Sequence, residues 1–225
     1  MKALSSRFPA LAYVAPFAVF AILLGLRGHL PIAPFLDYPL RTLLTLATLL
    51  AVSRPLLQFG VKKAWASIAI GLLVFFVWVC PDLLWPHYRE HWLFRNTLLG
   101  SGRTALPAVP YDSHFFLVFR VLGSALLVPV IEELFWRGWL MRWLIRKDFL
   151  NEPLGKYVPS AFWITAILFA SEHGPYWDVG LAAGLLYNWW MIRTRSLADC
   201  ILAHAVTNAC LAVYVLRDGK WQYWL

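Results

Sequence analysis

The chain alternates between long apolar runs and short polar breaks. Apolar residues dominate seven stretches, at about 8–26, 39–58, 64–85, 114–145, 157–173, 178–193 and 196–216. A helix needs about 20 mostly apolar residues to cross a bilayer. The pattern therefore predicts an all-α fold, namely a polytopic membrane helix bundle of seven transmembrane helices in one domain over residues 1–225.

The breaks between these runs carry turn and charge signals, among them Arg54-Pro55 and Gly174-Pro175. The longest break, at about 86–113, predicts either an interfacial hairpin or a short additional helix that would bring the bundle to eight spans. It contains the residues Arg89, Trp92, Arg95 and Arg103.

Composition agrees with a membrane protein and argues against a soluble enzyme. The chain is 60% apolar and 14% charged, whereas a soluble domain carries about 25% charged residues. The net charge of +8 suits anionic lipid as a partner. No basic cluster interleaved with aromatic residues occurs, so we expect no nucleic-acid binding. The cysteines Cys80, Cys200 and Cys210 lie in apolar runs and are expected to be buried thiols.

The distribution of Lys and Arg predicts a cytoplasmic N-terminus. No convincing small-residue cleavage site ends the first run, so we expect it to be a retained helix. With seven spans, the cytoplasmic segments hold Lys2, Arg7, Arg54, Lys62, Lys63, Arg142, Arg146, Lys147, Lys156, Arg193 and Arg195. The outer segments hold Arg27, Arg89, Arg95, Arg103, Arg217 and Lys220.

Three charged residues interrupt the fourth apolar run at its middle: Glu132, Glu133 and Arg137. A charge at the centre of a bilayer costs roughly 2.5–3.5 kcal/mol even on the lenient insertion scale. Glu133 and Arg137 are four residues apart, so they share a helix face and can pair. Glu132 points about 100° away from Glu133 and is left out of that pair. Either all three form a structural ion network, or Glu132 is a functional group.

Two more polar pairs lie in the later runs. Phe169 and His173 share a helix face just before Gly174-Pro175, and His204 shares a face with Asn208. Each pair alone is typical of a helix end or of polar contacts between helices. Together with Glu132, the two imidazoles and the amide are a set that can perform general base catalysis and stabilise an oxyanion.

These residues resemble the CAAX protease and bacteriocin-processing family, whose eukaryotic members are the type II CAAX prenyl endopeptidases. The family pattern of Glu-Glu-x-x-x-Arg, Phe-x-x-x-His and His-x-x-x-Asn is present, in order, at Glu132 to Arg137, Phe169 to His173 and His204 to Asn208. The resemblance covers about residues 120–212, within a motif-bearing core of about 112–216. The context around the two glutamates looks most similar to the bacterial subgroup found with exosortase systems.

The resemblance implies an intramembrane glutamate endopeptidase in a membrane, the bacterial inner membrane for that subgroup. It would hydrolyse a membrane-associated peptide or protein tail and need no cofactor. Glu132 would activate water with help from His173, and His204 and Asn208 would form the oxyanion hole. The supporting residues would be Glu133, Arg137 and Phe169.

Other interpretations stay open at this point. Glu132, His173 and His204 are an acceptable zinc ligand set, and Cys200 with His204 could form a thiol–imidazole pair. A Gly-x-Ser-x-Gly elbow is absent. Some relatives look like non-proteolytic scaffold or bacteriocin-immunity proteins. The substrate and the oligomeric state do not follow from the sequence. The remaining histidines, His29, His87, His91 and His114, are expected at the membrane interfaces.

Overall fold

The computed structural model describes residues 8–57, 60–94 and 113–224, and all the regular structure in these ranges is helical. The all-α prediction is therefore confirmed for the described residues. The α-helices are α2 (Leu11–Gly25), α3 (Pro34–Thr48), α4 (Ala64–Leu84), α5 (His114–Leu122), α6 (Val128–Glu133), α7 (Met141–Trp143), α8 (Pro159–Ser171), α9 (Trp177–Thr194) and α10 (Leu197–Asp218).

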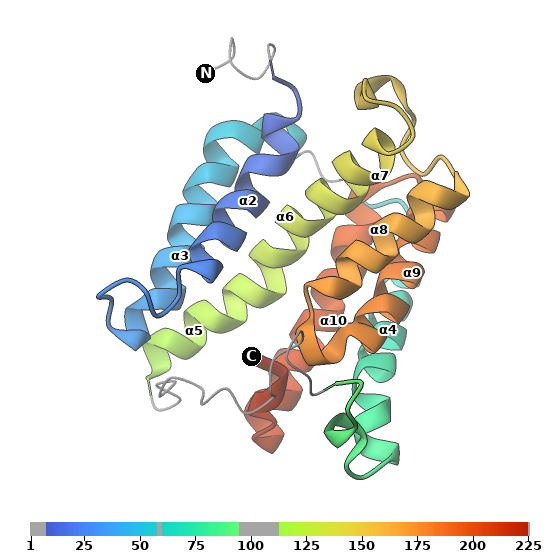
Figure 1. Ribbon diagram of the computed structural model, residues 1–225. Helices are drawn as coiled ribbons and strands as arrows, with labels where there is room; N and C mark the ends of the chain where they lie inside the picture. The colour runs from blue at the N-terminus through green and yellow to red at the C-terminus, as the bar shows by residue number, and fades with distance from the viewer. Residues whose placement is uncertain (1–7, 58–59, 95–112, 225) are drawn as a thin grey trace.

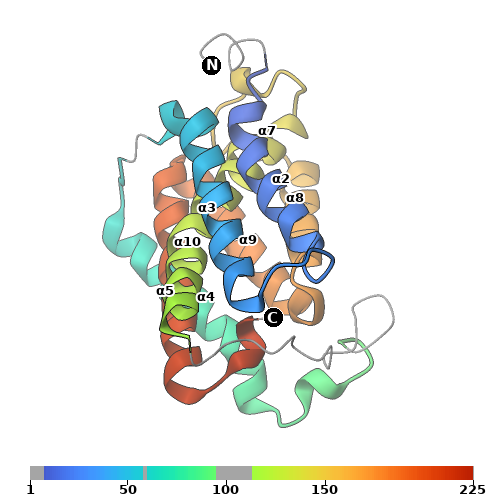
Figure 2. The ribbon, with the colours of Figure 1, turned by 90° about the vertical axis from the view of Figure 1, so that its left-hand side faces the viewer.

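The helices join into seven rods that follow the seven apolar runs. Helices α5, α6 and α7 are parts of one oblique rod, His114–Trp143, joined by the π-helical segments Gly123–Leu127 and Leu134–Leu140. In Figure 1 this rod crosses the molecule between α2 and α3 on one side and α8, α9, α10 and α4 on the other. Figure 2 views the molecule from the side of α2 and α3, which pack against each other in front of the other helices.

Only some of these rods are long enough and apolar enough to cross a bilayer. The helical stretches Pro34–Leu56, Ala64–Leu84, His114–Trp143 and Leu197–Asp218 meet both conditions among the described residues. Helices α2 and α8 are apolar but shorter. The 13 residues of α8 rise about 20 Å, against a hydrocarbon core of about 30 Å. The fold is thus a seven-rod membrane bundle with four clear candidate spans.

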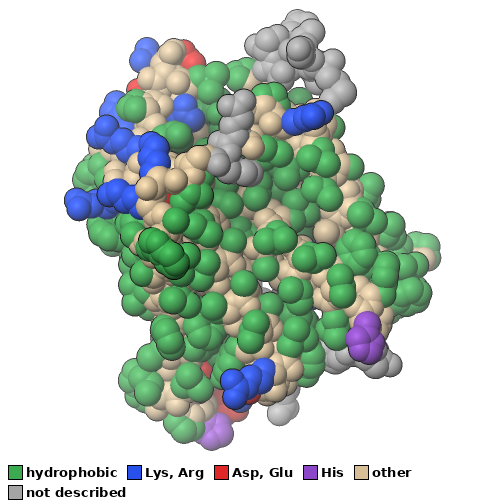
Figure 3. Space-filling view, turned by 180° about the vertical axis from the view of Figure 1, so that it is seen from behind, with side chains coloured by type: hydrophobic (Ala, Val, Ile, Leu, Met, Phe, Trp, Pro, Cys, Tyr) green, Lys and Arg blue, Asp and Glu red, His purple; other side chains and the backbone are tan. Residues whose placement is uncertain are grey.

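The surface has an apolar belt with cations gathered at one end. Figure 3 shows hydrophobic side chains over the middle of the molecule and Lys and Arg side chains mostly at the end where α7 finishes. The chain turns at this end after α3, α7 and α9. The exposed cations at these turns are Arg54, Lys62, Lys63, Arg146, Lys147, Lys156, Arg193 and Arg195.

Helix boundaries follow local chemistry. Proline is in the first turn of α3 and α8, where its missing N–H costs no hydrogen bond. Ser113 and Ser196 precede α5 and α10, and each side chain accepts a hydrogen bond from a backbone N–H in the first turn. Helix α10 ends at Gly219, which has a φ of 65°, the left-handed conformation that favours glycine.

The longest packing seam joins α4 to α10. Gly71 of α4 lies so close to α10 that a Cβ there would be 2.4 Å from the carbonyl oxygen of Ala203. At the start of α4, the carboxylate of Asp199 accepts hydrogen bonds from the backbone N–H of Lys62 at 2.9 Å and of Lys63 at 2.7 Å. The seam therefore combines close backbone approach with a charged cap supplied by the neighbouring helix.

The described part of the long break forms a short 3-10 turn at Tyr88–Glu90. Within it, Arg89 donates to Asp82 at 3.1 Å and also to Asp178 at the start of α9. Arg95 and Arg103 lie outside the described residues, as do Lys2 and Arg7. The eighth span and the single-domain organisation stay predictions.

Candidate active site

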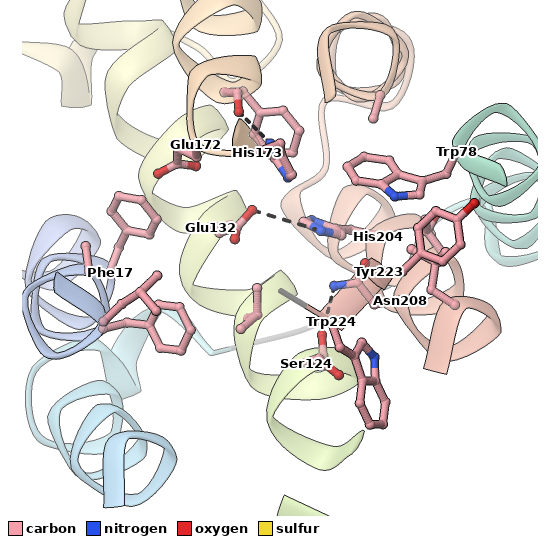
Figure 4. A pocket seen from close by; sticks show the side chains of 18 of the residues that line it. Phe17, Trp78, Ser124, Glu132, Glu172, His173, His204, Asn208, Tyr223 and Trp224 are labelled. Carbon is pink, nitrogen blue, oxygen red and sulfur yellow. Dashed lines mark hydrogen bonds and ion pairs between the residues drawn. The ribbon is translucent and has the colours of Figure 1, made fainter. Parts of the chain in front are cut away.

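A cavity of about 250 Å³ lies inside the bundle, between the oblique rod and helices α2, α3, α4, α8, α9 and α10. Glu132, His173, His204 and Asn208, the four residues predicted to be catalytic, all line it (Figure 4). Phe169 lines it as well. Predicted catalytic residues up to 76 positions apart in the sequence therefore meet in one cavity.

The expected pair of Glu133 and Arg137 is confirmed. Both side chains are fully buried, and Arg137 Nη1 donates to Glu133 Oε1 at 3.0 Å. The same Glu133 oxygen lies 3.0 Å from His204 Nδ1. One carboxylate oxygen thus joins the guanidinium of the oblique rod to an imidazole of α10.

Arg137 is held by further partners on α9. Its Nε donates to Asn188 Oδ1 at 2.9 Å, and its Nη2 donates to the carbonyl oxygen of Gly184 at 3.2 Å. The guanidinium carbon also lies over the rings of Phe169 at 4.7 Å and Tyr187 at 5.4 Å. Partners on every side satisfy the condition for a buried charge, which is otherwise costly.

Glu132 is separate from this network, as its place on the helix predicted. Its side chain is 12% exposed and faces the cavity. Its Oε2 atom has no hydrogen-bond partner among the described residues and lies 4.0 Å from His204 Nε2. That separation is too long for a direct hydrogen bond and matches the reach of one bridging oxygen atom.

The surroundings of His204 determine where its protons are. Because Glu133 is paired with Arg137, its carboxylate accepts a hydrogen bond, and His204 Nδ1 must be the donor. The ring stacks on Tyr187 with 4.9 Å between centroids, which fixes its plane. Nε2 is left to face Glu132.

His173 reaches the cavity because α8 ends early. Its Nδ1 lies 2.8 Å from the carbonyl oxygen of Phe169, so Nδ1 carries a proton and Nε2 of the neutral ring is an acceptor. Trp78 contacts the ring edge-on at 5.1 Å, and a Cβ on Gly180 would be 3.0 Å from Nδ1. Because α8 ends at Ser171, before Gly174-Pro175, His173 lines the same cavity as Glu132.

Asn208 is one turn further along α10 than His204. Its Nδ2 donates to the carbonyl oxygen of Ser124 at 2.8 Å. This acceptor belongs to a π-helical segment, where the altered backbone pairing leaves carbonyl groups available to side chains. An amide has two N–H donors, so one stays available to a ligand in the cavity.

Several site residues were not singled out from the sequence. Asn188 is a fully buried amide in an apolar run, and this rarity was the signal that could have found it. Tyr187 and Trp78 are aromatic residues among many, so only the fold reveals that they flank the two imidazoles. Glu172 also lines the cavity, beside His173.

The geometry bears on both alternative chemistries, the zinc site and the thiol–imidazole pair. Among the described residues, Glu132, His173 and His204 do not form a cluster able to hold a metal ion, and neither does any other set of three or more His, Cys, Asp and Glu. Cys200 is fully buried and directs Sγ to the carbonyl oxygen of Tyr187 at 3.8 Å. The histidines expected at the periphery are all exposed: His29, His87, His91 and His114.

Comparison with known proteins gives one match. Residues 114–210 match the model of a family described as type II CAAX prenyl endopeptidase Rce1-like. This range contains all three predicted motifs. No curated protein and no solved structure matches the chain.

Proposed function

Since residues 114–210 carry a type II CAAX prenyl endopeptidase Rce1-like domain, we propose that this protein is an intramembrane endopeptidase whose Glu132 activates the attacking water. That family is a protease family, and the apolar helices make the chain an integral membrane protein. The observation that carries the mechanism is the position of Glu132, which faces the cavity while the adjacent Glu133 is paired with Arg137.

In the proposed reaction, the Glu132 carboxylate takes a proton from water as the water oxygen attacks the peptide carbonyl carbon. The 4.0 Å separation between Glu132 Oε2 and His204 Nε2 suits an oxygen atom held between them. Nε2 of neutral His173 can accept the second hydrogen of the same water and orient it. Collapse of the tetrahedral intermediate breaks the C–N bond, and Glu132 returns its proton to the leaving amine.

The negative oxygen of the intermediate would be stabilised by His204 and Asn208. Asn208 contributes the N–H that does not bind Ser124. His204 donates from Nε2 as an imidazolium, because its Nδ1 proton is committed to Glu133. The charges of Glu132, Glu133, Arg137 and His204 then sum to zero, which suits a buried site.

The test is hydrolysis of membrane peptides by the protein reconstituted in liposomes. Candidate peptides come from comparing the membrane peptidome of cells with and without the protein. We expect Glu132→Ala to lower turnover by roughly 10²–10⁴-fold, the usual contribution of a general base, and Glu132→Asp to retain part of it. Asp218→Ala is the control, because it removes an exposed carboxylate that does not line the cavity, and should keep most activity. Full turnover by folded Glu132→Ala would refute the mechanism.

Two further outcomes address the alternatives. Activity that resists strong chelators would support the cofactor-free reaction, whereas loss restored by zinc would favour metal chemistry at Glu132, His173 and His204. A biological phenotype that persists in Glu132→Ala without any cleavage would favour a non-proteolytic scaffold or immunity role.

We also propose that the cation-rich end of the bundle faces the cytoplasm, with the N-terminus on that side and the bacterial inner membrane as the location. The exposed Lys and Arg at the turns after α3, α7 and α9 support this orientation. Labelling of single cysteines placed at Lys63 and Lys220 in intact cells would test it, because only the second should react from outside.

A further inference from the structure

Arg41, near the middle of α3, is a buried cation with most of its hydrogen bonds unmade. Its side chain is 4% exposed, and its Nε and Nη1 atoms have no hydrogen-bond partner among the described residues. The nearest acid is Asp37, whose Oδ2 lies 3.5 Å from Nη2. A buried guanidinium with unmade hydrogen bonds is costly, so its position suits a site that binds an anionic group.

Arg120, on the oblique rod, lies beside it. The guanidinium carbons of Arg41 and Arg120 lie 4.9 Å and 4.5 Å from the ring centre of Tyr38. Arg120 donates one hydrogen bond, from Nη2, to the carbonyl oxygen of Trp224 at 2.8 Å. The two cations and Asp37 leave one net positive charge, which matches a single carboxylate.

The two arginines share the cavity with the proposed catalytic residues. Arg41, Arg120 and Glu132 all line it. Arg120, Ser124, Val128 and Glu132 form a continuous wall at intervals of four residues. Twelve residues of helix rise about 18 Å, a distance that an extended peptide covers in about five residues. A carboxylate held at the arginines would therefore place a peptide bond a few residues away at Glu132.

We propose that Arg41 and Arg120 form an anion-binding subsite that holds a carboxylate of the peptide substrate, either its C-terminus or an acidic side chain. This inference rests on the proposed endopeptidase function. Two planar guanidinium forks suit a carboxylate, which can accept paired hydrogen bonds. Cations at one part of the cavity and Glu132 at another would also orient the peptide.

A lipid phosphate is the competing anion, and the burial of Arg41 argues against it. Lipid headgroups lie at the membrane interfaces, whereas Arg41 is enclosed by the rings of Phe20 and Tyr38. The exposed cations that suit headgroups are mostly at the opposite end of the bundle.

The test measures binding in nanodiscs of neutral phosphatidylcholine, with Glu132→Gln present in every protein to prevent turnover. The probes are three dansylated peptides of Leu-Ala-Leu-Ala-Leu: the free acid, its C-terminal amide, and an amide with Glu in the last position. We expect at least one carboxylate peptide to bind about tenfold more tightly than the neutral amide. Arg41→Gln and Arg120→Gln should each remove this preference, while Arg217→Gln, an exposed control, should keep it.

Equal affinity for all three peptides would overturn the proposal, as would a preference that survives both arginine substitutions. A preference that disappears when phosphatidylglycerol replaces part of the neutral lipid would assign the subsite to lipid phosphate and overturn it too. If Arg41→Gln fails to fold, Arg41→Lys and Arg120→Gln decide the outcome, since Arg120 is only half-buried. If the carboxylate preference is absent but cleavage still depends on Glu132, only the subsite is refuted. If Glu132→Ala still cleaves the peptide while the preference is present, only the water mechanism is refuted.

Discussion

Removing Arg137 should destabilise the whole fold, in addition to any effect on catalytic activity. In Arg137→Met, Glu133 keeps only His204 as a partner while staying fully buried. Breaking a buried ion pair by removing one member costs about 3–5 kcal/mol. For a chain of this size, 1 kcal/mol corresponds to a shift in melting temperature of about 2–4 °C, so we expect a decrease of roughly 6–20 °C.

The double variant Glu133→Gln with Arg137→Met tests the cause of that loss. It removes the orphaned carboxylate together with its partner, so it should be more stable than Arg137→Met alone. Arg193→Met is the matched control, because this side chain is exposed at the end of α9, and it should shift stability by no more than about 0.5 kcal/mol. Thermal unfolding in one detergent, followed by tryptophan fluorescence, measures all three variants. A loss below about 1 kcal/mol in Arg137→Met, or a double variant at least as unstable, would refute the reasoning.

Three further predictions concern packing. Gly180→Ala places a Cβ 3.0 Å from Nδ1 of His173. Because the His173 ring would be displaced, kcat should decrease about tenfold or more, with little change in melting temperature. An unchanged kcat would contradict this. Gly71→Ala should separate α4 from α10 at the carbonyl of Ala203 and cost about 1–3 kcal/mol in thermal unfolding, whereas an unchanged melting temperature would show that the seam adapts. Asp199→Asn weakens charge-assisted bonds to the start of α4 and should cost about 1–3 kcal/mol, with protease nicking near the start of α4 as a second readout.

Much of the site followed from the scarcity of polar residues in apolar runs. Charges inside a bilayer are costly enough that Glu132, Glu133 and Arg137 could be selected without any structure. The i,i+4 relation gave the correct partner for Glu133. These inferences use only local geometry, which the sequence carries directly.

The π-helical segments could not be predicted in the same way. In an unbroken α-helix, residues twelve positions apart point about 120° away from each other. Arg120 and Glu132 nevertheless line one cavity, and the π-helical turn at Gly123–Leu127 lies between them. A π turn changes the rotation per residue, and its location depends on tertiary packing rather than on apolar periodicity.

The sequence alone also could not predict that Arg41 and Arg120 lie near each other. The two residues are on different helices and are separated by 79 positions, and each alone is a single cation in an apolar run. Their shared contact with Tyr38 arises only when α3 packs against the oblique rod. Long-range contacts of this kind need the folded chain.

The shortness of α8 has a consequence for the lipid around the protein. Its rise of about 20 Å over 13 residues falls about 10 Å short of a typical hydrocarbon core. We expect the bilayer to thin locally where lipid meets α8, at a cost of fractions of a kcal/mol for each ångström of mismatch. We therefore expect acyl-chain length to act on α8, which ends at Ser171, two residues before His173. In thicker membranes the strain should concentrate at α8, so membrane thickness becomes a physical variable to which the cavity should respond.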